Sequence, residues 1–211
     1  TYTIQPIGAK TYTYSSVSPF VSPINTSTFA VNGTDSFGCV ASSAANVTIV
    51  VNPIPTIIAV SSSSTICAGS NATLQASGAI SYTWNPNIVA PSLIVTPTVT
   101  STYSVTGKDT NGCIDTETVS LNVNPTPLIN VVSTSSILCS GNTATITVSG
   151  ASSYTWSNGN NTNAITITPT ANVTYTITGM NGAGCIDSTT YTQNVTICTE
   201  VNGSLGKNTS I

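Results

Sequence analysis

The chain has 211 residues and carries very little charge. Lysine and arginine total three, aspartate and glutamate total six, histidine is absent, and charged residues make up 4% of the sequence, whereas about 25% is ordinary for a soluble domain. Three basic residues cannot form the surface that nucleic acid requires, which excludes nucleic acid as a partner. No apolar run reaches the about 20 residues of a membrane-spanning helix, so no membrane insertion is expected. A surface of Thr, Ser and Asn also lacks the charges that normally prevent self-association, so self-association is expected.

Two blocks of the sequence repeat at a spacing of 72 residues without a gap. The matched pairs are Cys67 and Cys139, Tyr82 and Tyr154, Trp84 and Trp156, Tyr103 and Tyr175, Gly107 and Gly179, and Cys113 and Cys185. The first block joins this register only at residues 1–9, which align with 71–79, so its opening segment is missing. Because repeats of this kind form structural units, we predict a truncated module at 1–52, complete modules at 53–124 and 125–196, and a tail at 197–211.

Short runs of Thr, Val, Ile and Tyr alternate with small polar residues, which predicts strands throughout and no helix. In the second block the predicted strands cover residues 56–60, 72–77, 81–84, 93–96, 102–106 and 113–123, and the third block repeats them. Asn111-Gly112 predicts a tight hairpin between the last two strands, because both residues tolerate positive φ. Proline after Asn52 and Asn124 separates the blocks, since it interrupts pairing and stiffens the connection. The predicted fold class is all-β, as tandem antiparallel sandwiches with a 72-residue repeat.

Each complete module has two aromatic residues at period 2, which places them on one face of a strand. These are Tyr82 with Trp84, and Tyr154 with Trp156. Sandwiches of this size commonly bury a tryptophan between their sheets, so we expect core aromatics. A platform on which carbohydrate stacks is the alternative.

The motifs of the repeat resemble a known group of proteins. Thr102-Tyr103-Ser104-Val105-Thr106-Gly107, then Asp109-Thr110-Asn111-Gly112-Cys113, then a strand into Val123-Asn124-Pro125, are similar to the PKD-like and immunoglobulin-like repeats of secreted Bacteroidota surface proteins. The tail is similar to the junction that precedes a type IX secretion sorting domain, and Asp187-Ser188-Thr189 resembles the O-glycosylation motif of that group. The resemblance implies an extracellular or cell-surface scaffold, such as a stalk, an adhesin arm or a filament part. It does not by itself assign a function.

Little in the sequence points to chemistry. Without histidine, serine and cysteine nucleophiles lack their usual base, so we expect no enzyme. Asp115 and Glu117 are not an evident acid pair, since the third block has Asp187 and Thr189 in their places. Asp109, Asn111 and Asp115 offer oxygen ligands for calcium around a hairpin, but without an EF-hand spacing. We therefore expect no cofactor and no metal site.

Six cysteines suggest disulfides and an oxidising, extracellular setting. Cys67 and Cys113 are 46 residues apart, as are Cys139 and Cys185, and each pair falls within one predicted module. We therefore predict two intramodule disulfides. Cys39 aligns with Cys113 but lacks an upstream partner, and Cys198 lies beyond the last predicted strand.

One hypothesis joins both remaining cysteines. The C-terminal tail of one subunit would fill the missing first strand of the next, with Ile197, Val201 and Leu205 as its apolar face and with an intersubunit bond between Cys39 and Cys198. A head-to-tail contact of this kind propagates a filament. Two alternatives stay open: the chain is a piece of a longer array in which Cys39 pairs upstream, or the tail closes onto its own chain.

The leading hypothesis from sequence is thus a structural subunit of an extracellular filament that binds other copies of itself. The alternative is a stalk or adhesin fragment of a larger tandem-repeat surface protein that binds glycans or surfaces. An enzyme is the least favoured class.

Overall fold

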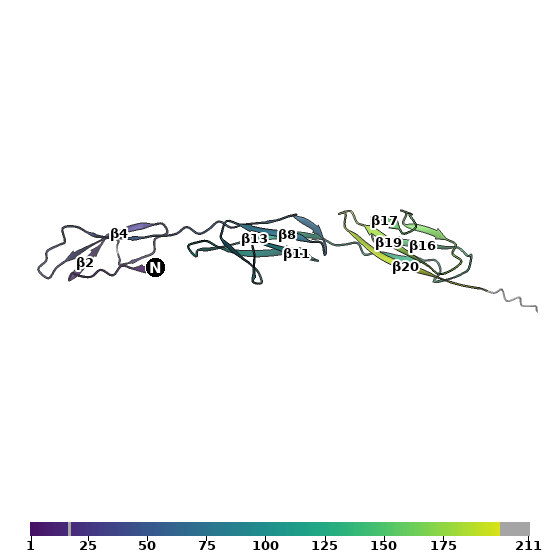
Figure 1. The fold of residues 1–211 in the computed structure, drawn as a ribbon, viewed down its shortest axis with the longest axis horizontal. Helices are drawn as coiled ribbons and strands as arrows, with labels where there is room; N and C mark the ends of the chain where they lie inside the picture. Colours follow the sequence, from purple (N-terminus) through teal and green to yellow (C-terminus); the bar gives the residue numbers. More distant parts are fainter. Residues whose placement is uncertain (17, 199–211) are drawn as a thin grey trace, which may run out of the picture. The chain divides into compact units, whose positions relative to one another are not determined.

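The protein is all-β in the computed structural model, which describes residues 1–16 and 18–198 (Figure 1). The described residues contain no helix, so no helix in them could cross a membrane. The predicted all-β class with antiparallel sheets is confirmed. The strands fall into three sets along the chain, and every sheet draws its strands from one set.

The bounds of the strands are as follows. The first set comprises β1 (Tyr2–Thr3), β2 (Thr11–Tyr14), β3 (Phe20–Val21), β4 (Ser27–Thr34) and β5 (Ala45–Ile49). The second comprises β6 (Ile58–Ser61), β7 (Thr65–Cys67), β8 (Ala72–Ser77), β9 (Ser81–Trp84), β10 (Ile88–Val89), β11 (Ser92–Val95), β12 (Ser101–Lys108) and β13 (Ile114–Asn124). The third comprises β14 (Asn130–Ser133), β15 (Ile137–Cys139), β16 (Ala144–Ser149), β17 (Ser153–Trp156), β18 (Ala164–Ile167), β19 (Val173–Met180) and β20 (Ile186–Thr196).

The third set is a two-sheet sandwich. One sheet has the order β14-β16-β18 and the other β15-β20-β19-β17, an arrangement of the immunoglobulin type. The core lies between the sheets and contains Leu138, Ile146, Trp156, Ile167 and Ile177, which come from five different strands. The fold is therefore held by apolar side chains that alternate along strands with exposed polar ones.

The second set has the same order in its two sheets, β11-β8-β6 and β10-β9-β12-β13-β7, with β10 as an additional edge strand. Apart from β10, each strand of the second set has a counterpart 72 residues later, as β6 and β14 (130 − 58 = 72) and β13 and β20 (186 − 114 = 72) illustrate. The first set has fewer strands, in the sheets β1-β3 and β2-β4-β5.

The aromatic residues of the repeat lie in the cores and also bind the backbone. Trp84 and Trp156 are buried, and their Nε1–H groups donate to the carbonyl oxygens of Ala90 (3.1 Å) and Thr162 (2.8 Å). The Tyr154 hydroxyl donates to Ala151 O (3.0 Å) and accepts from Ala151 N (2.8 Å), and Tyr82 does the same with Ala79. These side chains are packed and hydrogen bonded, which does not leave them as an open stacking platform.

Contacts between Cα atoms divide the chain into two compact units. The first contains residues 1–62, 73–93 and 102–119, and the second contains 63–72, 94–101 and 120 to the end of the described chain. The boundary runs through the second set of strands. The module boundaries expected from the repeat, after residues 52, 124 and 196, stay predictions.

Gly150 and Gly141 form a matched pair for testing the turns of the third set. Both have positive φ, but a Cβ on Gly150 would collide with the Leu128 carbonyl, whereas nothing lies within 4 Å of one on Gly141. We expect Gly141→Ala to lower the free energy of unfolding by about 1 kcal/mol, which is the cost of left-handed backbone. Gly150→Ala should cost at least about 1 kcal/mol more, measured by denaturant unfolding. Equal losses would contradict the collision.

Candidate functional site

Three loops of the chain present a cysteine in the same way. They cover residues 35–39, 109–113 and 181–185, and each runs from Asp or Asn to Gly-Cys. In the third loop, Asn181 Oδ1 accepts hydrogen bonds from Ala183 N and Cys185 N, both at 3.0 Å, and Asn181 N donates to Cys185 O (3.0 Å). Asp109 and Asp35 make the equivalent bonds in the other two loops. The side-chain oxygen thereby fixes the cysteine at the tip of its hairpin.

The remaining cysteines of the repeat lie at the ends of two short strands. β7 pairs in parallel with the last part of β13, with Cys67 opposite Asn124. β15 pairs in the same way with β20, with Cys139 opposite Thr196. Parallel pairing makes the ends of both strands coincide. Cys67 therefore lies at the end of β13 that is opposite to the 109–113 loop.

The predicted intramodule disulfides are wrong for this reason. From Cys113 to Asn124 an extended strand covers about 35 Å, whereas the Cα atoms of a disulfide lie within about 7 Å of each other. The same length of extended strand separates Cys185 from Thr196. Because Cys139 lies opposite Thr196, it is equally far from Cys185. The structure instead joins Cys67 to Cys185, with Cα atoms 5.5 Å apart, and Cys139 to Cys198, with Cα atoms 5.4 Å apart.

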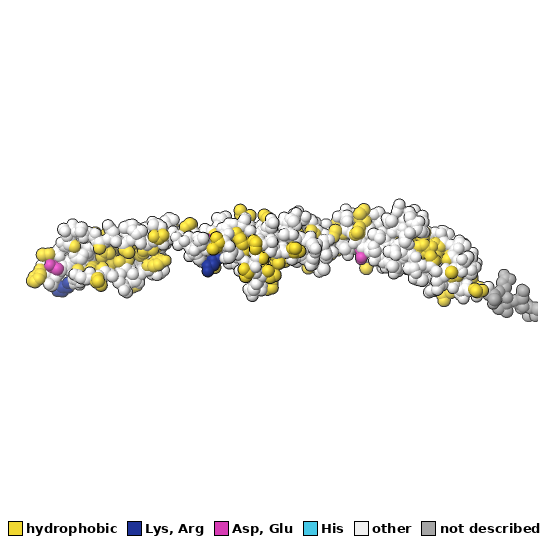
Figure 2. Space-filling view, in the orientation of Figure 1, with side chains coloured by type: hydrophobic (Ala, Val, Ile, Leu, Met, Phe, Trp, Pro, Cys, Tyr) yellow, Lys and Arg dark blue, Asp and Glu magenta, His cyan; other side chains and the backbone are white. Residues whose placement is uncertain are grey.

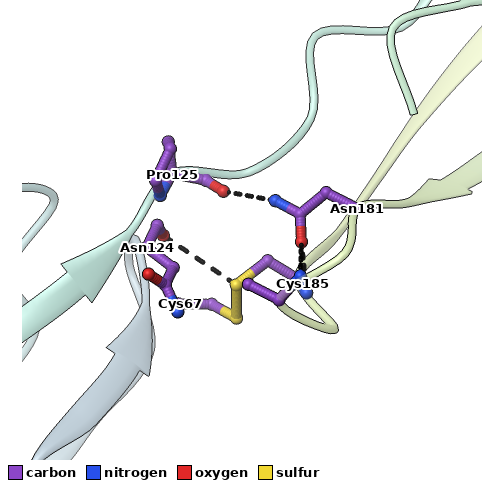
Figure 3. Close-up of a disulfide and its surroundings, with 6 residues drawn as sticks. Cys67, Asn124, Pro125, Asn181 and Cys185 are labelled. Atoms are coloured by element: carbon purple, nitrogen blue, oxygen red, sulfur yellow. Dashed lines mark hydrogen bonds between the residues drawn. A yellow bond between two sulfur atoms is a disulfide. The ribbon is translucent and has the colours of Figure 1, made fainter. Parts of the chain in front are cut away.

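The Cys67–Cys185 bond joins a strand end of the second set to a hairpin loop of the third, within one compact unit (Figure 3). Asn181 Nδ2 donates to Pro125 O at 2.8 Å, and Cys185 Sγ lies 3.9 Å from Asn124 O. Cys185 is 0% exposed. The paired ends of β7 and β13, with Cys67 and Asn124, and the following Pro125 thus form a site that holds a cysteine loop. We call such a site a receptor.

The predicted bond between Cys39 and Cys198 of different subunits also needs correction, because Cys198 is bonded to Cys139 of its own chain. Cys198 is thus tied to the third set of strands of its own chain, and not to the first set, where the hypotheses for the tail placed it. Cys39 is a free, exposed thiol, and Cys113 is a free, half-buried one. Phe37, beside Cys39 in its loop, is 90% exposed.

The first set leaves an open edge at β5 in the described part of the chain. Its sheet has the order β2-β4-β5, with no counterpart of β7 or β15 on β5. Ser27 pairs with Ile49 as Val173 pairs with Gln193, so Ile49 and Gln193 hold equivalent positions. Gln193 is completely buried, as is Leu121 at the same position in β13, whereas Ile49 is only half-buried. Gln193 is covered by the segment that contains β14 and β15, through hydrogen bonds with Ser133 Oγ and Ser136 O. The sheets of the first set have no counterpart of either strand in the described residues, which accounts for the difference.

An apolar groove follows this open edge. It has a volume of about 370 Å³ and is lined by Tyr2, Ile4, Pro6, Val31, Val47 and Ile49, among others. The lining of the groove ends at Ile49, and the next residues, 50–52, lie in no strand, with Val50 65% exposed. Their counterparts, residues 122–124, are those that pair with β7. The groove therefore lies beside the residues on which a short parallel strand pairs in the other two sets.

Of the residues predicted to form the donor face, only Ile197 lies within the described chain, where it is 85% exposed. Val201 and Leu205 lie outside the described residues. Of the candidate calcium ligands, Asp109 accepts hydrogen bonds from two backbone amides of its own loop through Oδ1. Across residues 1–16 and 18–198, no group of three or more His, Cys, Asp and Glu side chains could hold a metal ion.

The visible surface carries few charged atoms (Figure 2). Apolar atoms are exposed in several places, and the larger exposed side chains of the first set include Ile7, Ile24, Phe37 and Val40. Such a surface offers little electrostatic resistance to contact between copies of the chain.

No family model matches the sequence, and no curated protein matches it. Solved structures match at low identity. Murine CEACAM1b is 12% identical and has a TM-score of 0.30, over 67% of this chain and 100% of that one. A 1.5-MDa bacterial ice-binding adhesin is 15% identical with a TM-score of 0.31, over 81% and 74% of the two chains. The N-terminal eight Ig domains of DSCAM are 9% identical with a TM-score of 0.37, over 82% and 27%. At these TM-scores the likeness carries no argument about this chain.

The disulfide pattern predicts which thiols react with an alkylating reagent. In the native, unreduced chain we expect iodoacetamide to modify Cys39 rapidly and Cys113 slowly, because the first is exposed and the second half-buried. Peptide mapping by mass spectrometry should recover the pairs Cys67–Cys185 and Cys139–Cys198. Recovery of Cys67–Cys113 would contradict the parallel pairing of β7 with β13.

The open edge predicts unequal costs for equivalent substitutions. Leu121→Ala removes a fully buried side chain and should lower the free energy of unfolding by about 2–5 kcal/mol. Ile49→Ala removes one that already contacts solvent, so we expect a loss below about 1 kcal/mol in the dilute monomer. Denaturant unfolding at low concentration measures both. A similar loss for both variants would mean that β5 is covered.

Proposed function

We propose that the protein is a structural subunit of an extracellular filament, which assembles head to tail when the C-terminal segment of one copy occupies the open edge of β5 in the next. The observation that carries this proposal is the half-buried Ile49 in a position that is fully buried in both other sets. A sheet edge with unpaired amides and carbonyls, next to an apolar groove, is a site for strand addition.

The donor has a suitable length. A donor strand on residues 50–52 would run parallel to the direction of β5, in the way that β7 runs parallel to β13. The tail continues the chain from β20 beyond Cys198, and the sequence supplies 13 residues after it (211 − 198 = 13). Fully extended, these reach about 43 Å, while a strand equivalent to β13 extends for about 35 Å. Ile197, Val201 and Leu205 would supply apolar side chains to the groove.

The disulfides support an extracellular setting, since bonds of this kind persist in oxidising compartments. The scarcity of charge favours contact between identical chains. Donor and acceptor are different surfaces, so the contact is heterologous and continues unless the rotation closes a ring.

A second candidate has the same supporting observation. If the chain is part of a longer tandem array, such as a stalk or an adhesin that binds glycans or another surface, an upstream segment covers β5 within the same polypeptide. The link from Cys67 to Cys185 joins successive sets of strands and would suit such an array. In that case the isolated chain stays monomeric.

Deletion of residues 201–211 tests the donor. We expect it to abolish assembly, as measured by sedimentation velocity and electron microscopy, without changing the unfolding of the third set. Ile49→Lys should have the same effect, because it places a charge in the groove. Ile94→Lys is the matched control, since Ile94 is already 68% exposed elsewhere. Unaltered filaments after the deletion would refute strand donation.

A second test adds the absent strand to the same chain and does not remove the donor. Residue 71 aligns with residue 1, so a copy of residues 53–70 placed before Thr1 would supply the absent strand. We expect this variant to remain monomeric and to alkylate more slowly at Cys113, because the added copy of Cys67 is positioned to bond it. Assembly at the wild-type rate would show that the β5 edge is not the contact.

A further inference from the structure

The loop that carries Cys39 is built like the loop that carries Cys185. In both, the first side-chain oxygen accepts from the amides of the third and fifth residues, at 2.8 and 2.9 Å for Asp35 and 3.0 Å each for Asn181. The first amide donates to the cysteine carbonyl at 3.0 Å in both loops, and the glycine before the cysteine has positive φ. Cys185 is bonded, whereas Cys39 is not.

The strand end that carries Cys139 is likewise built like the one that carries Cys67. Ser140 N donates to Thr196 O (2.8 Å) as Ala68 N donates to Asn124 O (2.9 Å). Gly141 N donates to Pro169 O (3.1 Å) as Gly69 N donates to Pro97 O (3.0 Å). The chain therefore contains a second receptor for a cysteine loop. Its sulfur is bonded to Cys198, two residues beyond the end of β20.

The Cys67–Cys185 bond shows how a cysteine loop and a receptor combine within one molecule. A loop of the 181–185 kind places its sulfur on a strand end of the 65–67 kind, with Cα atoms 5.5 Å apart (Figure 3). One contact of this pair is not copied: Asn181 donates to Pro125 O, and Asp35 has no hydrogen to donate in its place. The cysteine geometry and the loop backbone are otherwise duplicated.

We propose that Cys139 of the copy that donates its C-terminal segment forms a disulfide with Cys39 of the copy that receives it, by thiol–disulfide exchange that displaces Cys198. This deepens the proposed function and rests on it. The Cys39 thiolate attacks Cys139 Sγ, the Cys139–Cys198 bond breaks, and its electron pair leaves on the Cys198 sulfur, which takes up a proton. One thiol and one disulfide exist before and after, so no oxidant is needed.

The reaction couples covalent bonding to strand donation. The bond that Cys39 breaks is the one that ties Cys198, and with it the start of the donor segment, to Cys139. When Cys198 is released, Cys139 stays in β15, and the pairing of β15 with β20 holds the receptor in place. The Cys139–Cys198 bond thus protects the receptor within a single copy. Cys113 takes no part in the exchange, because Cys39 supplies its thiol and the Cys139–Cys198 bond is its disulfide.

The test follows the thiols during assembly of purified wild-type chain in buffer without oxygen or added oxidant. The number of thiols per chain should stay at two, while alkylation moves from Cys39 to Cys198. Peptic digestion in acid, which suppresses exchange, should yield a Cys39–Cys139 peptide in amounts that follow the assembled fraction. Cys113→Ser is the matched control and should leave the covalent joint unchanged.

The outcomes separate this inference from the proposed function. Cys39→Ser should abolish covalent linkage, while sedimentation still detects assembly through the donor segment. Assembly of wild type with Cys39 still reactive, with a Cys39–Cys198 or Cys39–Cys39 peptide, or with two thiols lost per joint would overturn the exchange and leave strand donation intact. Absence of any assembly by sedimentation would overturn both.

Discussion

The parallel pairing of one short strand with the last strand of its set determines the rest of the structure. β7 on β13 and β15 on β20 bring Cys67 and Cys139 to the end of the sandwich that lies opposite its cysteine loop. A disulfide within one set is thereby excluded by about 35 Å of extended strand. Leu121 and Gln193, which directly precede the paired residues, are fully buried, whereas Ile49 at the same position in a set without the short strand is half-buried.

The features predictable from the sequence were those set by local physics. Alternation of Thr and Val with small polar residues predicts strands, and the predicted ranges 72–77 and 81–84 coincide with β8 and β9. Asn111-Gly112 predicts the hairpin whose glycine has a φ of 84°. A strand of three residues is too short to produce alternation, so the range 56–60 was predicted while β7 was not.

The disulfide connectivity could not be read from the spacing of the cysteines. Equal separations of 46 residues establish that Cys67 and Cys139 are equivalent, as are Cys113 and Cys185, but six cysteines allow 15 pairings. The choice depends on which strand end meets which loop, and that follows from pairing between residues far apart in sequence. The open edge was predictable in outline from the repeat register, in which residue 1 aligns with residue 71. Its physical form, a buried position left half-exposed at Ile49, required the ladder registers.

A cysteine loop and a receptor for it lie in different sets of strands, which constrains any assembly that uses them. Cys39 is presented by the first set, and Cys139 by the third. A contact between two such surfaces on separate copies leaves one copy with its Cys39 loop unused and the other with its Cys139 receptor unused, so the contact can repeat. Because the reaction exchanges one disulfide for another, its direction is set by the noncovalent contact and not by the sulfur chemistry. Burial of Ile49 and of the exposed Phe37 is the contribution available to drive it.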